Sequence, residues 1–396
     1  MFNRKILILS LIAFLVRLLF ASNSLLGTGD SGAINSATYA YLQGEHVYEL
    51  PSIYLSNPPF SLHVLSYWRI LGSFLGHNNF ITFWKTFAAL FDSLLIVLIY
   101  EIGALLWKSK QQAFQASLFY ALNPIAIVIS SVHGQLESVW IFFTLLAFYL
   151  LIRKKKMMAI SAIIFGIGIS IKMVPLLLLP FIVLLLPRWR QRISYIGIAI
   201  VVFLILSYPE LYTSFPAVNR QVFMYQSTPW YWGISKIIYQ FSKSGLFSFA
   251  IAMQLNALLK YFMLGMIGLF WLIVNRNHSY RFLASTLTVL MLFFIFTPGF
   301  GLQYILWPVP FLILTKSNFL RRYLFLGSLI MLSSYDIGIM PISYPFIFLN
   351  NNVFNHTSLT VTDFLLYLLW GMCVLFFLKK YKRILKNVSF LKLKKM

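Results

Sequence analysis

Residues 5–24 read KILILSLIAFLVRLLFASNS, an apolar run that starts with a basic residue and contains one arginine. A helix rises about 1.5 Å per residue, so about 20 such residues cross the roughly 30 Å of hydrocarbon in a bilayer. Runs of this kind recur along the whole chain. Because 60% of the 396 residues are hydrophobic and only 10% are charged, too little polar surface remains to coat a soluble globule. The sequence predicts an all-α polytopic membrane protein.

Twelve transmembrane helices are expected, forming one integral-membrane domain over residues 1–396. Their ranges are 5–24, 84–107, 112–131, 136–152, 157–173, 174–187, 193–208, 248–274, 282–298, 302–315, 322–340 and 362–378. Pro175, Pro180 and Pro187 fall in the sixth range, which predicts broken or kinked helices there. The first outer loop, 25–83, is the longest connection, and its stretches 34–43 and 60–74 are expected to form short helices in the membrane interface.

The net charge of +23 comes mostly from short basic clusters between the apolar runs. These clusters fall on every second connection, and the last of them is the tail at 379–396. This alternation is the positive-inside pattern, so both termini are expected in the cytoplasm. Because membrane spans separate the clusters, the sequence offers no contiguous basic face for nucleic acid, which is not expected as a partner. The richness in Lys, Ile and Phe is compatible with a bacterial protein. The plasma membrane is therefore the expected location, with the endoplasmic reticulum membrane as the alternative.

The sequence GTGDSG at residues 27–32 contains Asp30, one of only nine acidic residues in the chain. Its last four letters copy the serine loop of trypsin-like proteases. A serine nucleophile needs a base and an orienting acid, and the second glycine of the protease loop and a β-rich scaffold are both missing. Asp30, which follows the first span at the predicted outer face, is therefore the candidate functional residue of this stretch.

Four groups of residues fall in order along the chain and at one predicted membrane face. They are Asp30 with residues 39–44, Tyr48 and Asn57-Pro58-Pro59; VHGQLE at 132–137 after Asn123-Pro124; IKMVP at 171–175; and Gln303-Tyr304 with Trp307-Pro308. Together they resemble the motifs of the GT-C class of multispanning glycosyltransferases, which use sugars linked to polyprenyl phosphate. The dolichyl-phosphate-sugar transferases, the GPI-anchor mannosyltransferases and bacterial relatives belong to this class. The motifs do not choose among them.

The resemblance implies an inverting transferase that moves a hexose, such as mannose or glucose, from a polyprenyl-phosphate donor to a lipid-linked or cell-envelope glycan at the outer face. The acceptor hydroxyl must lose its proton as it attacks the anomeric carbon, and Asp30 matches the catalytic acidic position of the class, so it is the expected general base. Cations or neutral donors are needed at the leaving phosphate. The expected donor-binding and acceptor-binding residues are Lys172, Arg220, His133, Gln135, Glu137, Gln303 and Tyr304.

No cofactor is expected beyond the lipid-linked sugar donor. Paired-carboxylate motifs such as Asp-x-Asp do not occur in the sequence, so the enzyme is expected to work without a metal ion. The single cysteine, Cys373, excludes disulfides and thiolate metal sites within the chain.

Simpler interpretations compete with these roles. Asp30 and Glu137 suit the first turn of a helix, where carboxylates are favoured. Lys172 could extend to the membrane interface, and Arg220 could be a solvated loop residue. Arg17, inside the first span, is expected to have a structural role, such as pairing with an acid.

The aromatic group Pro229-Trp230-Tyr231-Trp232 could stack on sugar rings or belong to an aromatic belt. His133 could be an ordinary interfacial histidine.

Two other protein classes also fit twelve spans. A secondary transporter commonly has two similar halves joined by a long cytoplasmic segment, but here the middle connection, near residue 209, is predicted on the outer face. A flippase or polymerase of lipid-linked oligosaccharides is expected to place basic residues deep in a central cavity. The gathering of acidic residues at one face favours the transferase.

Overall fold

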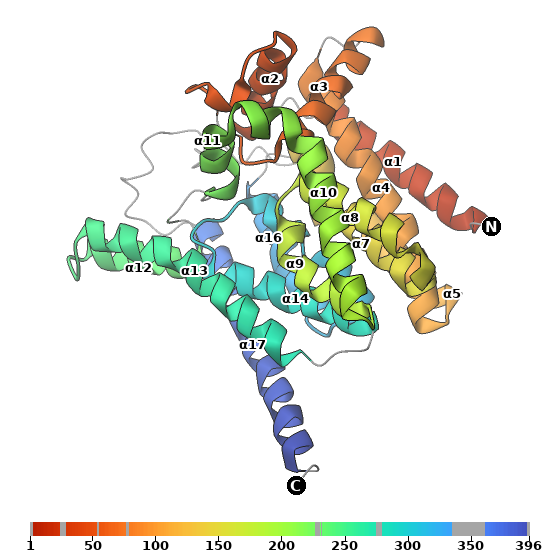
Figure 1. The fold of residues 1–396 in the computed structure, drawn as a ribbon, viewed down its shortest axis with the longest axis vertical. Coiled ribbons are helices and arrows are strands. Elements are labelled where there is room, and N and C mark those ends of the chain that lie inside the picture. The colour runs from red at the N-terminus through yellow and green to blue at the C-terminus, as the bar shows by residue number, and fades with distance from the viewer. Residues whose placement is uncertain are drawn as a thin grey trace.

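A computed structural model describes residues 3–23, 29–53, 55–76, 79–225, 230, 232–274, 279–334 and 361–393. Over these residues the chain is almost entirely helical and contains no β-strand. The all-α class predicted from the composition is confirmed. Figure 1 shows α2 (Gly29–Leu42), α3 (Pro59–Phe74) and α11 (Phe215–Val218) near one end of the molecule, and the end of α17 (Val361–Leu393) at the opposite end.

Each of the twelve expected ranges overlaps helical structure. In chain order, the matching elements are α1 (Arg4–Asn23), α4 (Phe80–Trp107), α5 (Lys110–Ala121) with α6 (Pro124–Ile127) and the π-helix η2 (Val128–His133), α7 (Glu137–Arg153), α8 (Met158–Ile171), α9 (Val174–Ile182) with η4 (Val183–Leu185), α10 (Trp189–Thr213), α13 (Phe249–Ile273), α14 (Ser279–Phe296), η6 (Leu302–Leu306) with α15 (Val309–Leu314), α16 (Leu320–Ser334) and α17.

Five of these helices in the described part of the chain are long and apolar enough to cross a bilayer by themselves: α1, α4, α10, α13 and α17. The segment from α5 to η2 would be a sixth, although it bends by 51° at a short break. Shorter apolar helices cover Val174–Leu185, Phe282–Phe296 and Leu302–Leu314. The chain is therefore a multi-pass membrane protein in which several expected spans are short or broken.

The predicted break in the fifth and sixth ranges lies between α8 and α9. Lys172 follows the last residue of α8 and has an extended backbone (φ −154°, ψ 142°), and Pro175 lies in the first turn of α9. A proline suits a first turn because the N–H that it lacks would have no helical partner there. Pro180 lies inside α9, where it removes a backbone donor from an already short helix.

The two interfacial helices expected in the first outer loop are α2 and α3. Arg69 of α3 joins them, because its Nη1 donates to the carbonyl oxygen of Asn35 at 3.0 Å and to its side-chain oxygen at 2.8 Å. The same nitrogen donates to the hydroxyl of Thr38 at 3.1 Å. The hydrogen bonds of Arg69 therefore hold the two helices of the first outer loop against each other.

Gln221, in the π-helix η5 (Asn219–Phe223), attaches the first outer loop to the fourth, which is the connection predicted at about 209–247. Its Oε1 accepts from the backbone N–H of Leu55 at 2.7 Å, and its Nε2 donates to the Tyr48 carbonyl at 2.7 Å. The Tyr48 hydroxyl donates to the carbonyl of Asn57 at 2.8 Å. Burial, together with the nearby Glu210 carboxylate, raises the pKa of Tyr48 well above its usual range, so this phenol remains a donor.

The fourth outer loop contains a helix that the sequence reasoning did not predict, α12 (Gly233–Lys243). Just before it, Trp232 is only 1% exposed, and its ring stacks on Phe300 with 3.9 Å between centroids. Its Nε1 donates to the Phe294 carbonyl at 2.5 Å. Trp232 is therefore a packed core residue, which rules out both the sugar-stacking and the aromatic-belt interpretation for it. Tyr231 lies outside the described residues.

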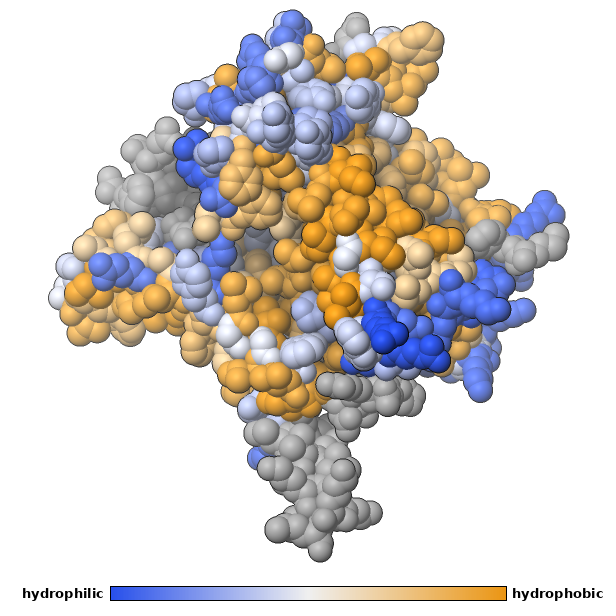
Figure 2. All heavy atoms as spheres, in the orientation of Figure 1, coloured by the Kyte–Doolittle hydropathy of each residue, from blue (hydrophilic) through white to orange (hydrophobic). Residues whose placement is uncertain are grey.

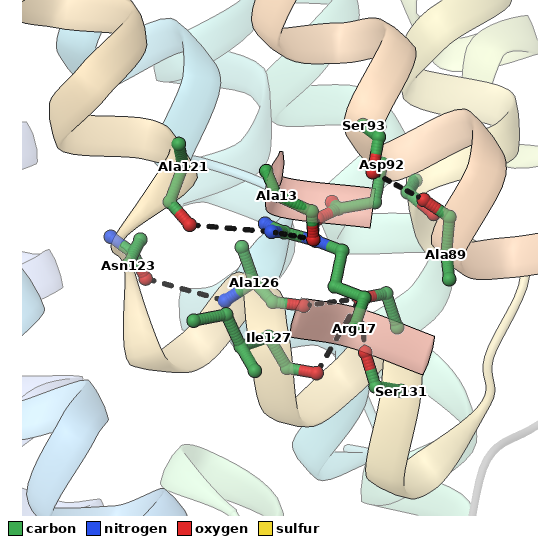
Figure 3. Close-up of polar contacts among 12 residues, drawn as sticks. Ala13, Arg17, Ala89, Asp92, Ser93, Ala121, Asn123, Ala126, Ile127 and Ser131 are labelled. Carbon is green, nitrogen blue, oxygen red and sulfur yellow. Dashed lines mark hydrogen bonds and ion pairs between the residues drawn. The ribbon is translucent and has the colours of Figure 1, made fainter. Parts of the chain in front are cut away.

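A buried ion pair connects the first three spans (Figure 3). Arg17 of α1 donates through Nε to Asp92 Oδ2 of α4 at 2.5 Å, and both side chains are fully buried. Its Nη1 also donates to the carbonyls of Ala13, at 3.2 Å, and Ala121, at 3.3 Å, the latter at the end of α5. The hydroxyl of Tyr120 donates to Asp92 Oδ1 at 2.6 Å. Arg17 has the structural pairing expected for a charge inside a span.

The outer surface matches a membrane environment. Figure 2 shows a broad apolar area over α10 and its neighbours, with hydrophilic residues at the α2 end and a strongly hydrophilic group near the start of α10. Exposed side chains of α10 include Ile193, Val201, Leu204 and Ile205, all about half exposed or more. Exposed aliphatic side chains of this kind are stable against lipid tails.

Candidate functional site

Glu137 is the centre of a buried polar cluster. It is the first residue of α7 and is 0% exposed. Its Oε1 accepts from Lys172 Nζ at 2.5 Å, and its Oε2 accepts from the indole N–H groups of Trp140 at 2.9 Å and Trp307 at 2.6 Å. A buried carboxylate needs such partners, because an isolated charge in this environment is very costly.

Lys172 reaches Glu137 because α8 ends one residue earlier and the backbone is extended there. Its side chain is 14% exposed, so the ammonium group lies at the edge of the core. The nitrogen also lies 5.3 Å from the ring centroid of Tyr304 and 5.5 Å from that of Trp307. Aromatic faces attract a cation in this geometry. The cluster thus presents one partly accessible positive charge held by one buried negative charge.

The segment that leads into Glu137 has an unusual backbone. Asn123 caps α6 by accepting from the N–H groups of Ile125 at 2.9 Å and Ala126 at 3.3 Å. The following π-helix η2 ends at Gly134, which has φ +73°. A Cβ at Gly134 would lie 2.4 Å from Trp84 Nε1 and 2.6 Å from Lys85 Cγ, so only glycine fits there. The π-helix and this turn place the motif 132–137 against α4.

His133 and Gln135, two of the expected binding residues, flank that glycine. Both are buried, and His133 Nε2 lies 3.3 Å from Gln135 Nε2. They lie next to Glu137 along the chain, and the binding roles predicted for them stay predictions, since buried side chains of this kind also occur in ordinary cores.

Gln303 and Tyr304 lie in η6, close to the same cluster. Tyr304 is 4% exposed, and its ring packs on Trp307 with 4.2 Å between centroids. The side chain of Gln303 folds back over Gly301, where a Cβ would lie 2.6 Å from Gln303 Oε1. Three of the four motif groups, at 132–137, 171–175 and 303–308, therefore meet around Glu137.

Two predicted site residues remain, and of these Arg220 is not joined to the cluster by any interaction among the described residues. Asp30 is the second residue of α2, and its side chain lies outside the described part of the structure. Arg220 lies in η5 and is exposed, next to the Gln221 clamp that holds the first outer loop. The roles predicted for both residues stay predictions.

A second polar group was missed by the sequence reasoning. His63 Nε2 of α3 lies 2.5 Å from Glu210 Oε1 of α10, and the Tyr41 ring lies 5.2 Å from the His63 ring, centroid to centroid. Burial raises the pKa of Tyr41 above its usual value, and the nearby Glu210 and Tyr67 groups raise it further by charge repulsion. Glu210 is one of only nine acidic residues and stands near the predicted outer end of a span, which was the signal available in the sequence.

Metal ligands were also considered. Over the described residues, no group of three or more His, Cys, Asp or Glu side chains is close enough to hold a metal ion.

Comparison with known proteins gives one family. The family profile for the GPI transamidase subunit PIG-U matches residues 31–307, which is more than half of the chain and includes Glu137, Lys172 and Trp307. No curated protein matches the chain. The match agrees with a GT-C-like class of multispanning membrane proteins and is not specific for a sugar transferase that uses polyprenyl phosphate. The chain belongs to the PIG-U family of membrane proteins.

Proposed function

We propose that this protein is a glycosyltransferase that moves a hexose, mannose or glucose, from polyprenyl phosphate to a lipid-linked or cell-envelope glycan. The observation that carries the proposal is the meeting of three separate motif groups on Glu137. Lys172 and Trp307 contact this carboxylate from positions 35 and 170 residues further along the chain. Such a costly charged group is seldom kept within a membrane protein without a function.

In the proposed reaction, the hydroxyl oxygen of the acceptor attacks the anomeric carbon of the donor sugar. The bond between that carbon and the phosphate oxygen breaks, and its electron pair leaves with the phosphate. The proton of the hydroxyl passes to the Asp30 carboxylate, which acts as general base. One displacement of this kind inverts the anomeric centre.

Lys172 is proposed to bind the donor phosphate. Its side chain is partly accessible, and the phosphate gains negative charge as the sugar leaves, so a fixed ammonium group there lowers the barrier. Glu137 positions Lys172 without contacting the substrate, because it is fully buried. Arg220, exposed beside the first outer loop, is proposed as a second cation for the same lipid phosphate. No metal ion takes part in this scheme.

The test uses purified protein in nanodiscs with a panel of synthetic polyprenyl-phosphate hexoses and a cell lipid extract as the acceptor source. Products are detected by mass spectrometry, in the presence of EDTA. The Asp30→Asn variant is expected to lose roughly 10²–10⁴-fold in rate while it still binds the donor. Glu45→Gln is the matched control, since Glu45 is an exposed acid of the same loop. Full activity of Asp30→Asn would remove this residue from the mechanism.

The family match favours a second candidate function, because its description is that of a subunit. The chain would then recognise a glycolipid within a larger membrane complex without catalysing transfer. Under this alternative, wild-type protein binds a polyprenyl-phosphate hexose but forms no product, and affinity purification from its native membrane recovers a stable complex.

The plasma membrane is the proposed location, and the endoplasmic reticulum membrane is the alternative.

A further inference from the structure

We propose that the starts of α8 and α10 form a binding site for the headgroup of an anionic phospholipid. This site lies at the opposite end of α8 from Lys172, so it is separate from the proposed transfer site.

Helices α8 and α10 lie in parallel and in register. The Ser161 and Tyr195 hydroxyls are 3.0 Å apart, and a Cβ at Gly166 would lie 2.7 Å from the Ala199 carbonyl oxygen. The paired residues are offset along the chain by about the same number of positions in both contacts. Lys154, Lys155 and Lys156 lie just before α8, and Arg188 and Arg190 lie at the start of α10. Because the two helices run side by side in the same direction, both basic segments lie at the same end of the pair.

Five cations form this basic rim, and all of them are exposed: Lys154, Lys155, Lys156, Arg188 and Arg190. None has an ion-pair partner within the described ranges of the chain. By contrast, neighbouring Arg153 donates to the Tyr149 hydroxyl at 2.9 Å, and that hydroxyl donates to Glu101 at 3.1 Å. The rim thus carries positive charge that the protein itself does not compensate.

The backbone beneath the rim is fixed. Arg192 donates through both Nε, at 2.8 Å, and Nη2, at 2.6 Å, to the Leu186 carbonyl. This closes the turn between η4 and α10, so Arg188 and Arg190 are displayed from an ordered segment. Because the backbone is fixed, only side-chain freedom is lost when these two cations bind a phosphate.

The surface next to the rim is apolar. Ile160 and Ile163 of α8 are 50% and 42% exposed, and Ile193 of α10 is 58% exposed. Trp189 is 65% exposed, and the Arg190 guanidinium lies 5.9 Å from its ring centroid. Tryptophan is favoured at headgroup depth. Figure 2 shows the hydrophilic group directly against the apolar area near the start of α10. Cations beside exposed isoleucines fit a phosphate with acyl chains, and a free phosphate or nucleic acid would leave the apolar area unused.

The basic rim distinguishes lipids by the net charge of their headgroups. A basic residue near an anionic surface raises binding by roughly fivefold, and a zwitterionic lipid gains little because its own amine repels the rim. Phosphatidylglycerol is therefore expected to be retained in preference to phosphatidylcholine.

The experiment uses full-length protein in nanodiscs that contain equal amounts of palmitoyl-oleoyl phosphatidylglycerol and phosphatidylcholine. After extraction into detergent, the lipids that stay bound are counted by native mass spectrometry. The rim variant is K154Q/K156Q/R188Q/R190Q. The control is K108N/K110Q/R321Q/R322Q, which removes the same charge from exposed residues predicted on the same membrane face. Asn replaces Lys108 because that residue has φ +53°.

Wild-type protein is expected to prefer phosphatidylglycerol by roughly tenfold, the rim variant by less than about twofold, and the control variant as wild type does. An unchanged preference in the rim variant, or an equal loss in the control, overturns the proposal. The thermal unfolding midpoint in pure phosphatidylcholine discs checks that each variant is folded, and the double variant K156Q/R190Q replaces the rim variant if that one is not. None of these readouts depends on sugar transfer.

Discussion

Lys172 Nζ lies 2.5 Å from Glu137 Oε1, although the two residues are 35 positions apart and belong to different helical segments. Glu137 has no exposed surface, so this contact and two indole N–H groups supply its hydrogen bonds. The pair joins the start of α7 to the break between α8 and α9. It fixes the geometry of that break, in which Lys172 keeps partial access to the exterior.

Replacing Glu137 by Ala should lower the free energy of unfolding by roughly 3–5 kcal/mol, because a mostly buried ammonium group and two buried indole N–H groups lose their partner. The measurement is denaturant unfolding of purified protein in detergent. Glu45→Ala, at an exposed position of the first outer loop, serves as the control and should change stability by less than about 0.5 kcal/mol. Equal stability of the two variants would show that the Glu137 cluster contributes nothing to the fold.

Asp92→Ala should be similarly destabilising, by roughly 3–5 kcal/mol, because it leaves the Arg17 guanidinium buried without its counter-charge. The double variant R17M/D92L removes both charges and keeps most of the volume, so it should recover much of that loss. Unfolding curves of the wild type, the single variant and the double variant provide the comparison. A double variant no more stable than Asp92→Ala would contradict the ion-pair explanation.

Gly134→Ala should disturb the cluster around Glu137. The new methyl group would meet Trp84 and Lys85, and alanine is strained at φ +73°, so a loss of roughly 2–4 kcal/mol is expected. Gly197→Ala in α10 is the matched control, because no atom lies within 4 Å of its Cβ position. That change should stabilise the helix by up to about 1 kcal/mol. Thermal unfolding of both variants tests the contrast, and a neutral Gly134→Ala would mean that the turn can relax.

Trp232→Ala should cost roughly 3–5 kcal/mol, since it removes a buried indole stacked on Phe300 and a hydrogen bond to the Phe294 carbonyl. Trp189→Ala, at a tryptophan that is 65% exposed, should change stability in detergent by less than about 0.5 kcal/mol. If the two variants have the same free energy of unfolding, the contacts of Trp232 do not stabilise α12 as the structure indicates.

Much of the helical layout could be predicted from the sequence, because apolar length and basic clusters depend on local composition. The two helices of the first outer loop were also predicted from local sequence, and the break between the fifth and sixth ranges was predicted from its prolines. Helix α12 was not, although Ile234, Ile237, Ile238 and Phe241 follow a helical spacing. The neighbouring tryptophans were interpreted as surface residues that stack on sugars or form an aromatic belt. Only the packing of Trp232 against Phe300 excludes that interpretation for Trp232.

Within the candidate site, the sequence indicated the residues but not their partners. Glu137 and Lys172 were both singled out because they lie in motifs that resemble those of the GT-C class, each at the end of an apolar run. The contacts with Trp140 and Trp307, and the pairing of His63 with Glu210, depend on how distant segments pack. Tertiary packing of this kind has no local signature in one sequence.

The pairing of Arg17 with Asp92 also constrains the order of events during synthesis. The two residues are 75 positions apart, so α1 must leave the ribosome well before α4 exists. An unpaired arginine near the middle of a lone span raises the free energy of insertion by roughly 2.5–3.5 kcal/mol. The first span therefore inserts less favourably by itself than its apolar residues alone would allow, and the later pairing with Asp92 offsets that cost.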